Sequence, residues 1–235
     1  MENRSFLSLL QSTVQKRSAV LIGASGLIGG HLLRLLVNDE TYGQVTVPVR
    51  RSLSFRHPKL REYVVDFEHL DKQGDALTGQ EVFCCLGTTI KSAGTQAAFR
   101  KVDFTYVVEA ASIAAKNGAR QFLLVSSLGA DRNSRAFYLR VKGEVEQAVA
   151  QLPFKAVQIF RPSALLGERS TPRPMEKFSL TLLNLISRVF IGRLRRYRAI
   201  EAATVARAML VAAKQQNPGV TVYESERIQI LGQTR

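Results

Sequence analysis

The sequence predicts an α/β fold, a doubly wound parallel sheet with helices on both faces. Five short apolar runs between residues 19 and 126 are typical of buried strands, and helical patterns alternate with them. The first run breaks into regularly spaced glycines directly before a helical pattern. With 235 residues and 46% hydrophobic residues, the chain can bury one substantial core. We expect one domain over residues 18–235, preceded by an amphipathic helix over residues 1–17.

The first strand ends in a glycine-rich turn. Residues 20–22 are typical of a buried parallel strand, and Gly23, Gly26 and Gly29 follow at intervals of three. Glycine at these positions permits a tight turn, close approach of a pyrophosphate and close packing of the next helix, whose first N–H groups face the anion. This predicts a Rossmann-like dinucleotide site at Gly23, Ser25, Gly26, Leu27, Ile28 and Gly29. A purely structural turn is the alternative.

The second strand, residues 45–49, ends in Arg50, Arg51 and Ser52, about twenty residues after the last glycine. A site for the unphosphorylated dinucleotide has an acid at this point that accepts from the ribose 2′-hydroxyl, whereas arginine accommodates a 2′-phosphate. The sequence has no acid here, and the guanidinium groups offer the charge and donors that a phosphate requires. We therefore predict NADP(H), bound by Arg50 and Arg51. The alternative is that both arginines only solvate a strand end.

Two further strand ends contribute to the predicted site. The third strand, residues 62–67, ends in Asp66 and Phe67, where an acceptor and a flat ring suit an adenine. The fourth, residues 81–86, leads into a loop whose backbone and hydroxyl donors can line the central phosphates and ribose. The predicted contacts are Asp66, Phe67, Leu86, Gly87, Thr88 and Thr89. A plain loop is equally compatible with residues 86–89.

The later elements follow from periodicity and stop signals. Apolar residues at helical spacing predict a helix over residues 95–117, and Gly118 is a typical stop. Further strands are predicted at 122–126, 155–160 and 227–231, and a further helix at 201–215. Cys84 and Cys85 are adjacent in an apolar strand, a poor placement for a disulfide, and they lack metal-ligand spacing. We predict no metal site.

Candidate catalytic residues follow the fifth strand. This strand runs into Ser126 and Ser127, and Tyr138 comes eleven residues later with Lys142 at the next helical turn. An ammonium near the phenol favours its ionised form, so the tyrosine can exchange a proton with a carbonyl or alcohol oxygen. A strand-end serine hydroxyl can hold the same oxygen. The alternative is a solvated Tyr-Lys helix pair without chemistry.

These motifs resemble a known superfamily. Gly23-x-x-Gly26-x-x-Gly29, Ser126-Ser127 and Tyr138-x-x-x-Lys142 are similar to the short-chain dehydrogenase/reductase superfamily in its extended or atypical branch. More narrowly, the chain resembles the Tat-interacting-protein oxidoreductase family over residues 85–89, 126–131, 138–144, 160–162 and 204–209. The resemblance runs from about residue 17 to the C-terminus, but no motif covers residues 176–198.

The resemblance implies a role for each candidate residue. It makes Tyr138 the acid/base, Lys142 the group that binds the nicotinamide ribose, and Ser127 the substrate-orienting hydroxyl, with Ser126 as a competing choice. Arg161 and Pro162 then flank the nicotinamide. Many members of the superfamily have an asparagine that supports a proton relay on the helix after the fourth strand. The counterpart in this sequence is Asp103, so the chain departs from the superfamily pattern at this position.

The resemblance also makes residues 163–200 a substrate or lid insertion. These residues combine an apolar stripe with a basic end, which suits a lid helix or, as the alternative, an anionic membrane surface. The net charge of +14 favours polyanions in general, but no recognised nucleic-acid module is present, and we predict no specific nucleic-acid partner. The apolar stripe near the N-terminus makes a homo-oligomer plausible. The cysteine usage and the lack of an apolar leader predict a cytoplasmic protein.

The combined prediction is an oxidoreductase that transfers hydride between NADPH and a small-molecule carbonyl or alcohol, with Tyr138 completing the proton transfer. The alternative is an NADPH-binding regulatory protein that contacts protein partners and has little or no turnover. The resemblance supports both, because animal members of the family are discussed as regulatory proteins and as oxidoreductases.

Overall fold

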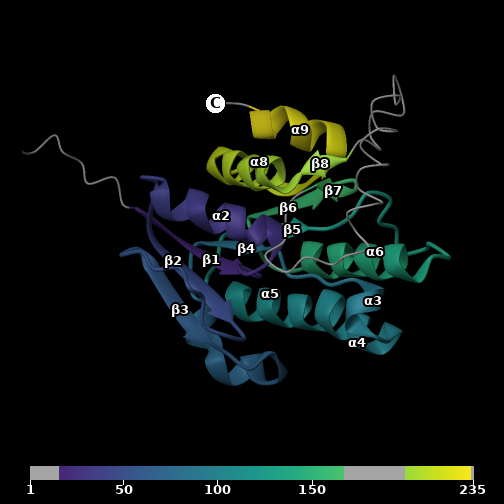
Figure 1. Cartoon of the computed structure of the whole chain (residues 1–235), viewed down its shortest axis with the longest axis horizontal. Helices are drawn as coiled ribbons and strands as arrows, with labels where there is room; N and C mark the ends of the chain where they lie inside the picture. The colour runs from purple at the N-terminus through teal and green to yellow at the C-terminus, as the bar shows by residue number, and fades with distance from the viewer. Residues whose placement is uncertain (1–15, 167–198, 234–235) are drawn as a thin grey trace, which may run out of the picture.

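The computed structural model describes residues 16–166 and 199–233, and most of these form one parallel sheet with helices on both faces (Figure 1). Seven strands of the described chain pair in the order β3-β2-β1-β4-β5-β6-β9. The order reverses between β1 and β4, which is where doubly wound sheets bind ligands. The predicted fold class is therefore confirmed. The strands are β1 (Arg17–Ile22), β2 (Tyr42–Val49), β3 (Leu60–Val64), β4 (Glu81–Cys84), β5 (Gln121–Val125), β6 (Ala156–Arg161) and β9 (Gly219–Glu224).

Alternate residues of the central strands pack against two helix layers. In β1, Ala19 and Leu21 share one core with α2 and α8, whereas Val20 and Ile22 share the other with α5 and α6. All four side chains are fully buried, as expected for a strand covered on both faces. One layer holds α2 (Leu27–Asn38), α8 (Ala202–Gln215) and α9 (Ser225–Gln233), and the other holds η1 (Phe67–Leu77), α5 (Tyr106–Lys116) and α6 (Phe137–Ala150) (Figure 1).

The helical region after β4 is interrupted. A short helix α3 (Ile90–Ala93) comes first, and the helix predicted over residues 95–117 then forms as α4 (Gln96–Arg100), a π turn η2 (Lys101–Thr105) and α5, which follow one another directly. A π turn inserts one extra residue into a helix, and such turns are frequent at functional sites. The turn contains Asp103, whose side chain is buried. Gly118, at φ +83°, ends the helix as predicted.

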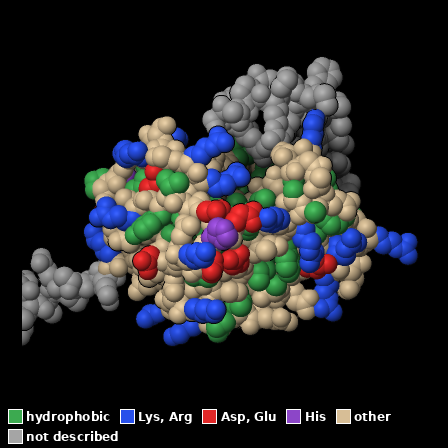
Figure 2. Space-filling view, turned by 90° about the horizontal axis from the view of Figure 1, so that it is seen from below, with side chains coloured by type: hydrophobic (Ala, Val, Ile, Leu, Met, Phe, Trp, Pro, Cys, Tyr) green, Lys and Arg blue, Asp and Glu red, His purple; other side chains and the backbone are tan. Residues whose placement is uncertain are grey.

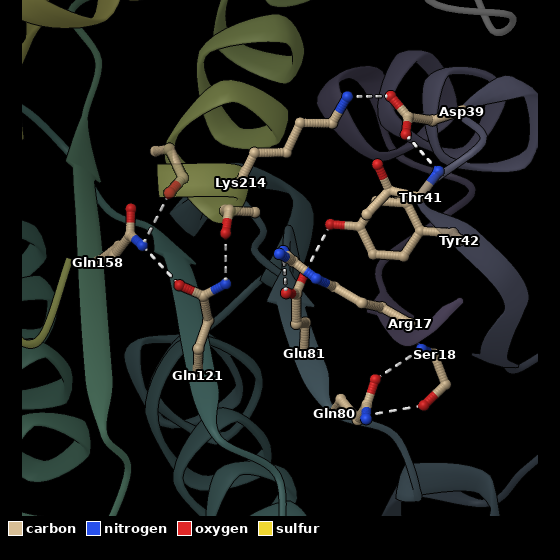
Figure 3. Close-up of polar contacts among 12 residues, drawn as sticks. Arg17, Ser18, Asp39, Thr41, Tyr42, Gln80, Glu81, Gln121, Gln158 and Lys214 are labelled. Atoms are coloured by element: carbon tan, nitrogen blue, oxygen red, sulfur yellow. Dashed lines mark hydrogen bonds and ion pairs between the residues drawn. The ribbon is translucent and has the colours of Figure 1, made fainter. Parts of the chain in front are cut away.

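Polar side chains hold the amino edge of the sheet together (Figure 3). Glu81 at the start of β4 is 2% exposed, and its carboxylate accepts hydrogen bonds from Arg17 Nη1 at 2.9 Å and from the Tyr42 hydroxyl. These two contacts offset the cost of burying a charge. Burial, together with the charge of Glu81 and the hydrogen bond to it, raises the pKa of Tyr42, so this phenol stays a donor.

Two buried glutamines attach α8 to the central strands (Figure 3). Gln121 of β5 donates to the carbonyl of Ala213 at 3.0 Å, and Gln158 of β6 donates to the carbonyl of Ala212 at 3.1 Å. Gln158 also donates to Gln121 Oε1 at 2.6 Å. The last carbonyls of a helix lack hydrogen-bond donors within the helix, and the two glutamine side chains donate to two of them.

The structure corrects two predicted strands. Residues 227–231 belong to helix α9, and the last strand is β9, in which Tyr223 is buried whereas Val220 and Val222 are exposed. Ile228 is fully buried against α8, so helical packing decides the structure of this segment. The third strand ends at Val64 and not at Phe67, because Asp66 caps the following η1 segment by accepting from the Glu68 N–H.

Other predictions fall outside the described residues. The N-terminal helix lies almost wholly in residues 1–15, and most of the insertion at 163–200 lies in residues 167–198. The described ends of that insertion, β7 (Leu165–Leu166) and β8 (Ile200–Glu201), pair in parallel beyond the carboxyl end of β6. In the part of the chain that is described, no helix is both long and apolar enough to cross a membrane.

Candidate functional site

The predicted site residues follow the carboxyl ends of neighbouring strands. The glycine turn follows β1, Arg50 and Arg51 follow β2, residues 86–89 follow β4, and Ser127 follows β5. Since β2, β1, β4, β5 and β6 are consecutive in the sheet, these segments line one edge. Two backbone hydrogen bonds join the ends of β5 and β6, from Ser126 N to Phe160 O at 2.7 Å and from Leu128 N to Pro162 O at 2.9 Å.

The glycine turn has the geometry of an anion site. Gly23 has φ +84°, and a Cβ there would lie 2.7 Å from the Cys85 carbonyl carbon. A Cβ on Gly29 would lie 2.1 Å from the Gly23 carbonyl oxygen, so both glycines are required by the packing of β1, β4 and α2. Gly26 is the N-cap of α2, and no side chain caps this end. The N–H groups of Leu27 and Ile28 are thus available to an anion, and a dinucleotide pyrophosphate fits here.

Arg50 and Arg51 lie directly after β2 and are exposed. Neither makes a hydrogen bond or ion pair with another of the described residues, so both guanidinium groups are free to meet a phosphate. Ser52 differs, because its hydroxyl donates to Glu62 Oε1 at 2.6 Å. Glu62 of β3 also accepts from the Leu53 N–H at 2.8 Å. These hydrogen bonds hold the pKa of Glu62 below its usual range, and its carboxylate also pairs with Arg56, with 3.8 Å between Oε2 and Nη1. The sequence alone did not indicate this acid beside Ser52.

The two residues predicted at the adenine have different surroundings. Asp66 is exposed, and its carboxylate is the cap of η1. Phe67 is 6% exposed, and its ring packs against Tyr106 at a centroid distance of 5.6 Å. The Phe67 ring is therefore a core side chain that leaves little surface for a purine, and one carboxylate oxygen of Asp66 is already engaged by the Glu68 N–H. The adenine contacts stay a prediction.

The loop after β4 lies against the glycine turn and the catalytic candidates. Gly23 approaches the backbone of Cys85 and Leu86, and Gly87 lies beside the Lys142 ammonium. The Thr88 N–H donates to Asp103 Oδ2 at 2.8 Å. Thr89 is the N-cap of α3, where its hydroxyl accepts from the Ser92 N–H at 3.1 Å. The structure thus brings this loop into the predicted site, although the hydroxyl of Thr89 already has a structural partner.

Tyr138 and Lys142 lie on one face of α6, as their spacing predicts. The Tyr138 ring packs against Phe99 at a centroid distance of 5.5 Å. Lys142 is 5% exposed and forms an ion pair with Asp103, with 2.8 Å between Nζ and Oδ1. Burial lowers the pKa of Lys142, but the carboxylate of Asp103 outweighs burial and the net direction is upward. The lysine is therefore a buried ammonium beside the phenol.

The two serines after β5 have different environments. Ser126 is 5% exposed, and its hydroxyl donates to Glu146 inside the protein. Ser127 is half-buried, and among the described residues its hydroxyl makes only a weak contact of 3.4 Å with the Leu128 carbonyl. Of the two, Ser127 is free to bind a substrate oxygen, while Ser126 is engaged in a structural contact.

Arg161 is held by two acids at the end of β6. Its Nε and Nη2 atoms contact both oxygens of Glu146 at 3.0 and 2.6 Å, and Nη1 lies 3.1 Å from Glu224. These hydrogen bonds keep the pKa of Arg161 above its ordinary value. Pro162, next to it, is buried. The guanidinium is thus saturated by carboxylates, so contact with a nicotinamide would involve its backbone or its aliphatic part.

Glu146 is the member of this cluster that the sequence analysis did not select. It lies four residues after Lys142 and eight after Tyr138, so all three share one face of α6. In the sequence, the spacing of four residues from Lys142 is the signal that could have pointed to Glu146. Its partner Arg161 is fifteen residues away on another element, and only the fold brings the two side chains together.

Comparison with known proteins agrees with this geometry. Residues 23–179 match the NAD(P)H-binding family. The chain is 40% identical over 205 residues to the protein HTATIP2 of Rattus norvegicus, covering 84% of this chain and 81% of that protein. It is 31% identical over 221 residues to the mitochondrial protein fmp52-1 of Aspergillus terreus, covering 92% and 95% of the two chains.

Solved structures share the fold at low sequence identity. MoeE5 in complex with UDP-glucose and NAD superimposes with a TM-score of 0.65 at 17% identity, covering 90% of this chain and 79% of that one. UDP-glucose 4-epimerase from Thermotoga maritima gives a TM-score of 0.65 at 18% identity, covering 88% and 76%. At this level of identity the likeness concerns the fold alone.

The chain is a NAD(P)H-binding protein, as the glycine turn and the match to the NAD(P)H-binding family indicate. Its sheet order gives it the fold of the extended short-chain dehydrogenases/reductases. Within that class, the chain belongs to the family of HTATIP2, the Tat-interacting-protein family that its motifs resemble.

The predicted cytoplasmic location is wrong. Several fungal relatives carry the word mitochondrial in their names, among them FMP52 of Candida glabrata and of Candida albicans. The prediction relied on cysteine usage and on the lack of an apolar leader. Neither signal separates the cytoplasm from mitochondria, whose targeting segments are amphipathic and rich in arginine.

Proposed function

We propose that this protein is an NADPH-dependent oxidoreductase that acts on a carbonyl or alcohol. The observation that carries the proposal is the convergence, at one edge of the sheet, of an uncapped helix N-terminus, a half-buried serine and a Tyr-Lys pair. A dinucleotide, when bound, donates or accepts the hydride. The glycine turn would hold its pyrophosphate, and Lys142 would face the nicotinamide ribose.

The protein's own residues would handle the proton. Tyr138 would exchange a proton with the substrate oxygen, Ser127 would donate a hydrogen bond to the same oxygen, and the Lys142 ammonium would favour the ionised phenol. Removal of a general acid of this type costs about 10²–10⁴-fold in rate. Lys142 is paired with Asp103, which favours a charged lysine over a wide pH range.

A panel of small carbonyl compounds tests this chemistry. We expect NADPH oxidation with at least one compound and a loss of about 10²-fold or more in Tyr138→Phe, with NADPH binding unchanged. Ser126→Ala serves as a matched control, because this hydroxyl contacts Glu146 and not the substrate side. Equal turnover by wild type and Tyr138→Phe would contradict the assigned role. NADPH binding without turnover would favour the regulatory alternative.

Arg50 and Arg51 support NADPH over NADH, because both guanidinium groups are exposed at the end of β2. We expect the double variant Arg50→Ala/Arg51→Ala to show a smaller thermal shift with NADPH than wild type and an unchanged thermal shift with NADH. Arg120→Ala is the control, since Arg120 is an exposed arginine at the amino end of β5, the opposite edge of the sheet. An equal loss of both thermal shifts would argue against a 2′-phosphate contact.

A further inference from the structure

Asp103 is a buried acid whose two oxygens contact two different parts of the site. It is 1% exposed and lies in the π turn η2. Oδ1 is 2.8 Å from Lys142 Nζ on α6. Oδ2 accepts a hydrogen bond of 2.8 Å from the N–H of Thr88, which lies in the loop after β4. One carboxylate therefore joins the π turn, the helix with the catalytic candidates and the loop predicted to line the cofactor.

Gly87 shows how closely this loop lies on the ion pair. A Cβ at this position would be 3.3 Å from Asp103 Oδ1 and 3.6 Å from Lys142 Nζ. Gly87 itself is exposed. The Gly87 backbone thus lies against the ion pair and is also exposed at the surface where a dinucleotide would lie, so a movement of the ion pair would displace this backbone.

The charge on Lys142 depends on its titratable neighbours. Among the residues that the structure describes, Tyr138 on its own helix and Cys84 of β4 act on the ammonium besides Asp103. Burial raises the pKa of Cys84 to about 11, so this thiol is neutral at physiological pH. Asp103 is therefore the counter-ion of a lysine that burial alone would discharge.

We propose that Asp103 is a positioning residue of the cofactor site, which holds Lys142 as a charged ammonium against the Gly87 to Thr88 backbone. The inference deepens the proposed function and rests on it for the lysine's role toward the dinucleotide. An asparagine would keep an acceptor for the Thr88 N–H but remove the negative charge. Lys142 would then be a buried ammonium without a counter-ion and would lose its proton more readily.

An NMR titration of the full chain without cofactor tests this proposal. Lysine labelled with ¹³C and ¹⁵N is followed at the Cε and Nζ atoms, and the Lys142 signals are assigned by their loss in Lys142→Met. We expect the Lys142 titration midpoint to fall by about one pH unit or more in Asp103→Asn. Asp103→Glu, which restores the charge, is expected to return the midpoint toward that of wild type. An unchanged Lys142 midpoint in Asp103→Asn would overturn the proposal.

A matched control comes from a second carboxylate-lysine pair. Glu68 and Lys101 lie 2.6 Å apart, and each side chain is about half exposed, with 48% and 49% of its surface open. Because water solvates both side chains of this pair, Glu68→Gln removes a carboxylate without leaving a buried charge, and it is expected to leave the Lys142 midpoint unchanged. If Asp103→Asn does not fold, Asp103→Ser provides the same comparison.

The titration is independent of the proposed function. If wild type bound neither NADPH nor NADH, the oxidoreductase proposal would fail, while a lowered Lys142 midpoint in Asp103→Asn would still support the positioning role. Conversely, NADPH binding with an unchanged midpoint would leave the oxidoreductase standing and remove Asp103 from its machinery.

Discussion

At the scale of single residues, the turn after β1 depends on two glycines for different reasons. Gly23 has a positive φ and lies close to the Cys85 backbone. At Gly29, an added Cβ would lie 2.1 Å from the Gly23 carbonyl oxygen. Both contacts involve backbone, which cannot rotate away as a flexible side chain can. The turn is thus fixed by internal packing before any ligand binds.

Gly29→Ala and Gly30→Ala form a sharp pair of variants on this turn. We expect Gly29→Ala to destabilise the protein by about 1–3 kcal/mol and to abolish the thermal shift with NADPH, because the turn must move. At Gly30 the nearest atom to an added Cβ is 3.7 Å away, so Gly30→Ala is expected to be neutral or to stabilise α2 by up to about 1 kcal/mol. Denaturant unfolding measures both, and equal effects would contradict this account.

Single residues also mark the limit of prediction from sequence. The glycine spacing and the Tyr138 to Lys142 spacing are local, so the sequence reveals both. The engagement of Ser126 by Glu146 and of Ser52 by Glu62 depends on side chains from other elements. Such contacts leave no periodic signal in the chain and became visible only in the fold.

Cys84 and Cys85 give a prediction about the reactivity of their thiols at pH 8. Burial raises its pKa to about 11, and that of Cys85 is also raised by burial. Since a raised pKa favours the thiol, about one Cys84 in a thousand is ionised at pH 8. We expect iodoacetamide to label neither cysteine in the native protein at pH 8 and both after unfolding in urea. Mass spectrometry measures the labelling, and rapid modification of Cys84 in the native protein would contradict its burial.

At the scale of elements, buried strands are predicted better than edges. β1, β4 and β5 read as apolar runs because both faces are covered, and the ends of these strands agree with the predicted ones to within three residues. β9 is an edge strand on which Val220 is 53% exposed and Val222 37% exposed, and its pattern is weaker. Here the sequence suggested a strand at residues 227–231, where packing against α8 instead forms a helix.

The attachment of α8 to the sheet gives a prediction at this scale. We expect Gln158→Ala to lower the free energy of unfolding by about 1–3 kcal/mol, because Gln121 Oε1 and the Ala212 carbonyl lose their donor inside the core. Gln147→Ala is the control, since Gln147 is exposed and accepts one hydrogen bond from Arg132. Its effect is expected to stay within about 0.5 kcal/mol. A denaturant midpoint for Gln158→Ala no lower than that of the control would refute the capping role.

At the scale of the whole molecule, the parallel sheet explains why residues far apart in the chain meet. Every strand of the seven-stranded sheet points its carboxyl end to the same edge, so segments from residue 23 to residue 162 converge there. The basic residues behind the net charge of +14 do not converge in the same way. On the face in Figure 2, Asp and Glu side chains gather in the middle and Lys and Arg side chains surround them. On this face, charge alone does not outline a polyanion site.

Isothermal titration calorimetry of wild-type protein with NADPH and with NADH tests the central claim most directly. An anion site at the start of α2 with two free arginines after β2 predicts saturable binding of NADPH. Its dissociation constant should be at least about tenfold below that of NADH, because charge-assisted hydrogen bonds to a phosphate contribute about 1.5–3 kcal/mol. No measurable binding of either dinucleotide, or tighter binding of NADH, would contradict it.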